Sequence, residues 1–164
     1  MSRKTLSLDR NWVEGSGRLV YDPIRTGMKN RTKRWAVIMV DREITRYFRW
    51  WVDRELLNIT GVDGFGLHQP SWDAHCSIIR GENDVRQVPT RELNELWGKY
   101  HNERVDFEYS LNVRQSGDTT EWDRPGHYWF VEVRCKKGTE IRKELGLPHD
   151  WNFHITVGRT YDRD

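Results

Sequence analysis

Two short stretches of the chain alternate between apolar and polar residues in the way that a half-buried β-strand does. Residues 74–80 read Ala-His-Cys-Ser-Ile-Ile-Arg, and residues 151–159 read Trp-Asn-Phe-His-Ile-Thr-Val-Gly-Arg. An alternation with a period of two predicts a strand with one buried and one solvent-facing side. In both stretches the solvent-facing side carries a histidine and, one strand repeat later, a hydroxyl. These residues are His75 and Ser77 in the first stretch and His154 and Thr156 in the second.

The rest of the chain alternates between strand and helix patterns. Apolar runs and strict alternation predict strands, whereas apolar residues at helical spacing after an N-capping residue predict helices. The order of a strand, a helix and then a motif strand occurs twice, which indicates an internal duplication. The predicted strands are residues 35–40, 75–79, 105–113, 128–133 and 154–157, and the predicted helices begin at Asp41 and Thr90 and span residues 138–145.

The repeated histidine-x-hydroxyl triplet predicts a specific chemistry. Either copy alone arises by chance in many proteins, and two strand histidines satisfied by local hydrogen bonds are the alternative interpretation. Cleaving a phosphodiester in one step needs a base on the attacking oxygen and an acid on the leaving oxygen, and imidazole suits both roles because it titrates near neutral pH. We therefore predict His75 and His154 as catalytic residues and Ser77 and Thr156 as donors to the non-bridging phosphate oxygens. No metal or other cofactor is required.

The two motifs resemble those of the two-histidine (2H) phosphoesterase superfamily, which includes LigT-like RNA ligases and cyclic phosphodiesterases. The second motif, from Pro148 to Arg159, is the closer match, while the first has Ser77 in place of the commoner threonine and Cys76 in a slot that is usually aliphatic. The resemblance covers residues 34–159. It implies an α+β fold of two pseudo-symmetric lobes, each a small antiparallel sheet backed by helices, with both motif strands facing a central cleft. Within one bilobal domain, residues 34–89 then form mostly the first lobe, residues 90–164 mostly the second, and residues 1–33 an N-terminal arm.

Length and charge narrow the class of ligand. A chain of 164 residues fits one domain or two closely packed lobes. The 27 basic and 25 acidic residues give a net charge of +2, which is too slight for a protein that coats duplex DNA but permits a local basic pocket. Two cysteines make no disulfide framework, and no secretory or membrane-length apolar run occurs. We expect a soluble protein of a reducing cytoplasm, the host cytoplasm if the protein is viral.

Three further residues are candidates for contacts with a substrate. The arm is interpreted as solvated surface or, alternatively, as a segment that folds over the cleft and stacks Tyr21 on a base. Trp122, in the polar loop 115–126, is a second stacking candidate, worth about 1–3 kcal/mol. Arg159 and Arg80 fall on the face opposite the hydroxyls if their strands are regular, so surface ion pairs are expected unless a bulge turns a guanidinium toward a phosphate. His149 and His154 lack the glutamate of a zinc-binding helix, and no metal site is predicted.

Together with the resemblance, these residues predict a metal-independent phosphodiesterase acting on a ribonucleotide. Its compact chain and modest charge favour a small cyclic ligand over a long RNA. The leading hypothesis is therefore cleavage of cyclic oligonucleotide signals, as by phage nucleases of the anti-CBASS type. The alternatives are an RNA-terminus 2′,3′-cyclic phosphodiesterase, a 2′,5′-RNA ligase-like enzyme and, in another class, a non-catalytic nucleotide-binding module. The sequence does not assign which histidine is the acid.

Overall fold

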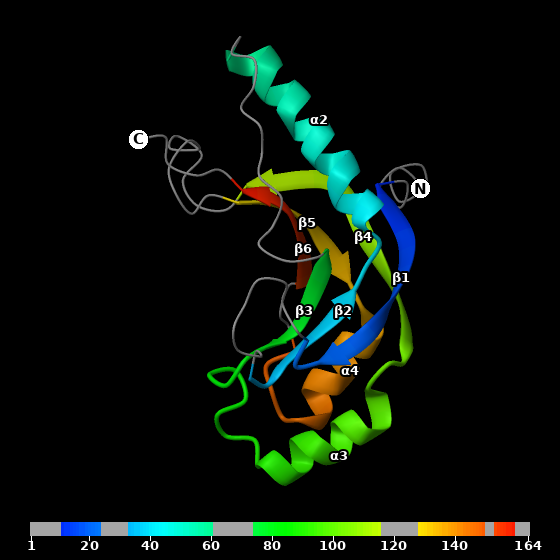
Figure 1. The fold of residues 1–164 in the computed structure, drawn as a ribbon, viewed down its shortest axis with the longest axis vertical. Helices are drawn as coiled ribbons and strands as arrows, with labels where there is room; N and C mark the ends of the chain where they lie inside the picture. The colour runs from blue at the N-terminus through cyan, green and yellow to red at the C-terminus, as the bar shows by residue number, and fades with distance from the viewer. Residues whose placement is uncertain (1–10, 24–32, 61–73, 116–127, 150–152, 160–164) are drawn as a thin grey trace, which may run out of the picture.

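The protein is described here by a computed structural model that covers residues 11–23, 33–60, 74–115, 128–149 and 153–159 (Figure 1). Most of the predicted elements are confirmed at nearly the predicted bounds. The elements are β1 (Trp12–Tyr21), β2 (Trp35–Met39), α2 (Arg42–Thr60), β3 (His75–Arg80), α3 (Thr90–Tyr100), β4 (Arg104–Gln115), β5 (Tyr128–Arg134), α4 (Lys136–Glu144) and β6 (Phe153–Arg159).

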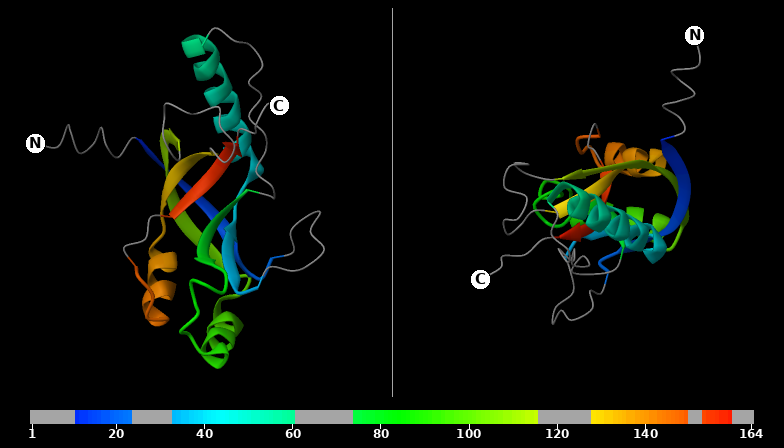
Figure 2. Two further views of the ribbon diagram at one scale, coloured as in Figure 1. Left: turned by 90° about the vertical axis from the view of Figure 1, so that its left-hand side faces the viewer. Right: turned by 90° about the horizontal axis from the view of Figure 1, so that it is seen from above.

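The six strands of the described residues form one closed antiparallel barrel in the order β1-β2-β3-β6-β5-β4. Seen from above in Figure 2, they make a ring. The expected antiparallel pairing is confirmed, but the expected division into two lobes with separate small sheets is not. β3 pairs with β6, and β1 pairs with β4 from Trp12↔Ser110 to Arg18↔Arg104, so both edges of each three-stranded half are joined. Closing the sheet leaves no unpaired edge strand.

The N-terminal arm is a correction to the sequence prediction, because residues 12–21 are strand β1 of the barrel. Two of its glycines, Gly15 and Gly17, lie where the chain is crowded. A Cβ on Gly17 would meet the backbone carbonyl of Met39 on β2, and one on Gly15 would lie 2.9 Å from the ring of Phe107 on β4. Glycine permits such close approach of neighbouring strands.

We expect Gly17→Ala to destabilise the protein by about 1–3 kcal/mol, the usual cost of forcing an extra methyl into a packed site. Because the added methyl group meets the backbone carbonyl of Met39, only a shift of β2 could make room for it. Gly98→Ala is the matched control: a Cβ there meets nothing within 4 Å, and the residue is exposed on α3. Alanine should add about 0.5–1 kcal/mol of stability at this position through helix propensity. Urea unfolding of both variants measures the two effects, and a Gly17→Ala protein as stable as Gly98→Ala would contradict the close packing of β1 on β2.

The helices lie at opposite ends of the barrel, with α2 at one end and α3 and α4 at the other (Figures 1 and 2). Asp41 caps α2 as predicted, its Oδ1 accepting the backbone N–H of Glu43 at 2.9 Å. Thr90 does not cap α3 and is its first residue, while its hydroxyl accepts a hydrogen bond from Arg34 at 2.6 Å. Among the described residues, no helix has the length and apolar character needed to cross a membrane.

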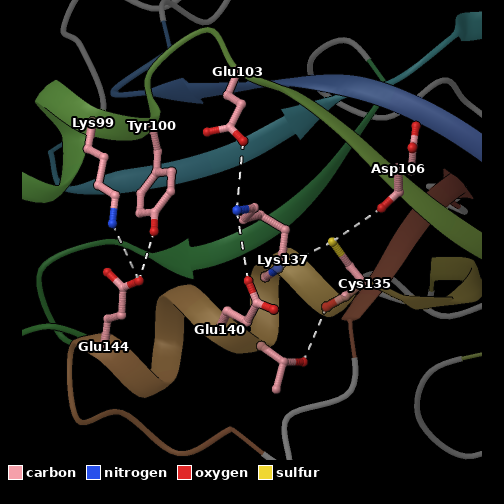
Figure 3. A network of polar contacts seen from close by, with 10 residues as sticks. Lys99, Tyr100, Glu103, Asp106, Cys135, Lys137, Glu140 and Glu144 are labelled. Atoms are coloured by element: carbon pink, nitrogen blue, oxygen red, sulfur yellow. Dashed lines mark hydrogen bonds and ion pairs between the residues drawn. The ribbon is translucent and has the colours of Figure 1, made fainter.

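Helix α4 is fixed against α3 and the start of β4 by the polar contacts in Figure 3. The Tyr100 hydroxyl donates to Glu144 Oε1 at 2.7 Å, and Lys137 Nζ lies 3.7 Å from Glu103 Oε1. On its other side α4 packs directly on both motif strands, because a Cβ on Gly138 would lie within 2.7–3.0 Å of the Ile78 and Phe153 side chains. The position of α4 is therefore coupled to the position of β3 and β6.

Candidate active site

The pairing of β3 with β6 brings the two predicted motifs together. Cys76 pairs with Ile155, and both side chains are completely buried in the core. Because the strands are antiparallel, the residues on either side of this pair face each other on the opposite surface of the sheet. His75 then lies opposite Thr156, and Ser77 opposite His154, all four being half-buried.

This register sets the spacing of the chemical groups. Side chains directly opposite on antiparallel strands have Cβ atoms about 4.5–5.5 Å apart, and diagonal neighbours are about 7–8 Å apart. The two histidines are diagonal neighbours, and so are the two hydroxyl residues. A diagonal spacing of this kind is wide enough for a group the size of a phosphate between the imidazoles, with one hydroxyl beside each. The arrangement can place a base and an acid on opposite sides of one phosphorus atom.

A β-bulge in β3 carries Arg80 to the same surface. Val37 of β2 pairs with Ser77 and the adjacent Ala36 pairs with Ile79, which leaves Ile78 as an extra residue. Ile78 and Ile79 are consequently both buried, and the alternation of the strand is inverted after them. Arg80 Nη2 lies 3.1 Å from Nδ1 and 3.2 Å from Nε2 of His154. The bulge therefore turns Arg80 toward His154, which is the alternative that the sequence left open beside a surface ion pair.

β6 has a matching irregularity after its own hydroxyl residue. Phe130 of β5 pairs with Thr156 and Trp129 pairs with Gly158, so Val157 is the extra residue. The next residue along, Arg159, pairs with Tyr128 at the end of the strand. Both motif strands thus place a bulge between the hydroxyl residue and the arginine that follows it.

β5 forms the wall of the site beside His154. The ring of Phe130 stands edge-on at 5.3 Å from the imidazole centroid, and the ring of Tyr128 stacks at 6.1 Å. Glu132 is the cross-strand partner of His154, and its carboxylate is paired with Arg114 at 2.6 Å. Sequence reasoning missed this wall, although Tyr128, Phe130 and Glu132 share one face of an alternating strand.

Cys76 lies between the motif residues but points away from them, as predicted. Burial raises the pKa of the Cys76 thiol far above its usual range, and Cys135 adds to the effect. Burial likewise raises the pKa of the Cys135 thiol. Both cysteines are free, and neither has the depressed pKa that a nucleophilic thiol needs.

The structure does not bring all the other candidates to this surface. Tyr21 stacks on Trp97 of α3, with ring centroids 4.8 Å apart and planes at 8°, so its aromatic partner is within the protein. Burial, followed by the charge of Asp22, raises the pKa of the Tyr21 hydroxyl. Trp122 lies outside the described residues.

The barrel also has a groove away from the motif residues. A groove of about 570 Å³ runs along β1 and β4, and its lining mixes acidic with basic side chains, among them Glu14, Arg104, Asp106 and Arg134. It does not include the motif residues. Within the described part of the chain, no three His, Cys, Asp or Glu side chains gather in a way that could hold a metal ion.

Comparison with known proteins identifies the family. Residues 58–164 match the sequence model of the Swiss Army Knife, 2H phosphoesterase domain, which covers both motifs and most of the chain. No curated protein and no solved structure gave a significant match. The chain belongs to the 2H phosphoesterase domain family, and its activity is of the phosphodiesterase type.

Proposed function

We propose that the protein is a metal-independent phosphodiesterase that cleaves a ribonucleotide phosphodiester between His75 and His154, and that its substrates are cyclic oligonucleotide signals. The observation that carries this proposal is the β3–β6 register, which places two imidazoles diagonally across one surface with a hydroxyl beside each. A domain that only bound nucleotides would not need two imidazoles at this spacing.

The reaction follows from the groups at hand. One imidazole takes the proton from the attacking oxygen, either of water or of a neighbouring 2′-hydroxyl, as that oxygen forms a bond to phosphorus. The other imidazole gives its proton to the oxygen whose bond to phosphorus breaks. Ser77 and Thr156 donate to the non-bridging oxygens, where negative charge accumulates in the transition state. These four side chains provide every proton transfer that the cleavage needs.

The surroundings of the site support a small nucleotide ligand. Tyr128 and Phe130 offer two aromatic rings next to His154, and base-aromatic stacking tolerates any base. Arg80 is a cation on the same surface. A net charge of only +2 favours a small ligand over a long RNA, which would favour a broader basic surface. Cleavage of the cyclic oligonucleotide signals of bacterial immunity, as a phage counter-defence in a host cytoplasm, fits these features.

We expect the EDTA-treated protein to cleave one or more members of a panel of cyclic di- and trinucleotides, resolved by chromatography. The same panel contains RNA ending in a 2′,3′-cyclic phosphate and a 2′,5′-linked dinucleotide. Turnover of an RNA end alone would replace the signalling hypothesis with RNA processing. Retention of a nucleotide without any turnover would instead indicate a binding module, and activity that returns only with added divalent metal would contradict the metal-independent mechanism.

A further inference from the structure

The contact between Arg80 and His154 distinguishes the two catalytic candidates. A guanidinium has only N–H donors and no acceptor, and it stays charged at any physiological pH. Arg80 Nη2 is within 3.2 Å of both ring nitrogens of His154. Because Nη2 is almost equally far from both nitrogens, it lies over the face of the ring and in line with neither lone pair. Charge is then the deciding factor, since an imidazolium in this position would face a like charge and a neutral imidazole would not. The contact therefore favours the neutral form of His154.

The contact depends on the bulge, and a buried ion pair fixes the bulge. Arg142 of α4 is completely buried and donates to the carbonyl of Ile78, the extra residue of the bulge, at 2.9 Å. It also forms a bidentate ion pair with Asp84, with Nη1 2.7 Å from Oδ2 and Nη2 3.0 Å from Oδ1. Asp84 Oδ2 in turn accepts the backbone N–H of Arg80 at 3.1 Å. The Arg142 guanidinium therefore holds the bulge directly at Ile78 and, through Asp84, at Arg80.

The same side chain reaches the second motif. Arg142 Nε donates at 2.6 Å to the carbonyl of Pro148, on the segment that leads into β6. The backbone at Arg80, from which its exposed side chain reaches His154, is consequently fixed by the packing of α4.

The other charges near His154 also favour its neutral form. Glu132 on β5 is the acidic group opposite the ring, and Arg114 neutralises it at 2.6 Å. Arg49 of α2, which packs on β6, donates to the Val157 carbonyl at 3.4 Å and adds another cation. Charged or titratable side chains on the elements around His154 include His75 and Arg80 on β3, Tyr128 and Glu132 on β5, Arg114 on β4, and Arg49 and Asp53 on α2.

We propose that Arg80 is a positioning residue that keeps His154 neutral before the reaction, so that His154 takes the proton from an attacking 2′-hydroxyl and His75 protonates the leaving oxygen. This assignment rests on the proposed function. When substrate binds, the phosphate draws the guanidinium away from the ring of His154. The proton of the hydroxyl passes to His154 as the new oxygen–phosphorus bond forms. The leaving oxygen departs with its bonding pair and receives the proton of His75.

A titration of the histidine ring protons by NMR, in the full chain, tests the role of Arg80 without substrate. In Arg80→Met we expect the pH at which His154 gains its proton to rise, because a neighbouring positive charge has been removed. Arg80→Lys should restore part of the difference, since it keeps the charge and loses the fork geometry. Arg91→Met removes an exposed guanidinium paired with Glu95 on α3 and should leave His154 unchanged. An unchanged His154 titration in Arg80→Met would overturn the role of Arg80.

The choice of leaving group tests the division of roles. Uridine 3′-(4-nitrophenyl phosphate) and uridylyl-3′,5′-uridine are both attacked by the 2′-hydroxyl, but only the second needs a proton on its leaving oxygen. On the dinucleotide, His75→Ala should be roughly 10²–10⁴-fold less active than the wild-type protein, which is the usual contribution of a general acid. On the nitrophenyl ester, the same variant should be nearly as active as the wild-type protein. His154→Ala should lose activity on both. Recovery in His154→Ala instead would reverse the assignment.

The two tests separate this inference from the proposed function. If the wild-type protein cleaves neither diester, 2′-hydroxyl attack fails as a mechanism and the assigned roles fail with it. The NMR titration would still decide whether Arg80 acts on His154. If the diesters are cleaved and His154 is indifferent to Arg80, the proposed function stands and the inference falls.

Discussion

Alanine at His75 or at His154 is expected to lower kcat on the cleaved nucleotide by about 10²–10⁴-fold, the usual contribution of a general acid or base. Binding of the substrate should largely survive, because Ser77, Thr156 and the aromatic wall remain. The double variant should be only slightly less active than the less active of the two single variants, since the two imidazoles act on the same transition state. Single-turnover kinetics together with ligand-binding measurements separate the two effects.

The pH dependence provides a second measurement of the same pair. One imidazole must be neutral and the other protonated, so kcat/KM of the wild-type protein should fall on both sides of an optimum. Each single variant should lose one limb of that profile. His149→Ala is the control, because this exposed histidine lies only five residues before His154 and outside the site. A pure binding module would show no difference between any of these variants, and that result would contradict the catalytic interpretation.

The motif strands could be predicted from the sequence because their information is local. A period of two assigns Cys76 and Ile155 to the core and the histidines to the other face, and the structure agrees at each of these positions. The pairing that makes a site of them is not local. The register Cys76↔Ile155 joins residues 79 positions apart, and alternation within each strand cannot specify it.

The position of Arg80 shows how a small irregularity changes the interpretation of a strand. Two consecutive apolar residues, Ile78 and Ile79, interrupt the alternation, and this interruption was the available signal for a bulge. Its consequence depended on which residues of β2 pair with β3. An extra residue in one strand shifts every later side chain to the other face, so Arg80 lies on the surface that carries the two histidines and not on the expected one.

Strand β1 was missed for a different reason. Gly15 and Gly17 interrupt its apolar pattern, and glycine is unfavourable in an isolated strand. In the barrel these positions are crowded by Phe107 and by the backbone at Met39, so tertiary packing selects the residue with no side chain. Local propensity and the fold disagree at such positions, and only the neighbouring strands explain the choice.

Removing Asp84 is expected to destabilise the protein by about 3–5 kcal/mol, because it takes away a carboxylate that pairs with a completely buried guanidinium. Arg142 has no exposed surface, and the Asp84 side chain is only 10% exposed, so water cannot replace the lost partner. A loss of this size is a large fraction of the 5–15 kcal/mol or so that stabilises a typical domain. Urea unfolding of Asp84→Ala measures it.

Two comparisons make this result specific to the buried pair. Glu95→Ala breaks the exposed Arg91–Glu95 pair, whose side chains are 89% and 68% exposed, and should cost less than about 0.5 kcal/mol. The double variant Asp84→Leu with Arg142→Met replaces both charges with apolar groups and should recover much of the stability, since an apolar pair needs no desolvation of charge. It should not recover activity, because the bulge that directs Arg80 to His154 would have lost its hydrogen bonds to Arg142 and Asp84. Equal costs for Asp84→Ala and Glu95→Ala would show that the pair is not a structural anchor, and full activity in the stable double variant would show that the bulge holds its shape without it.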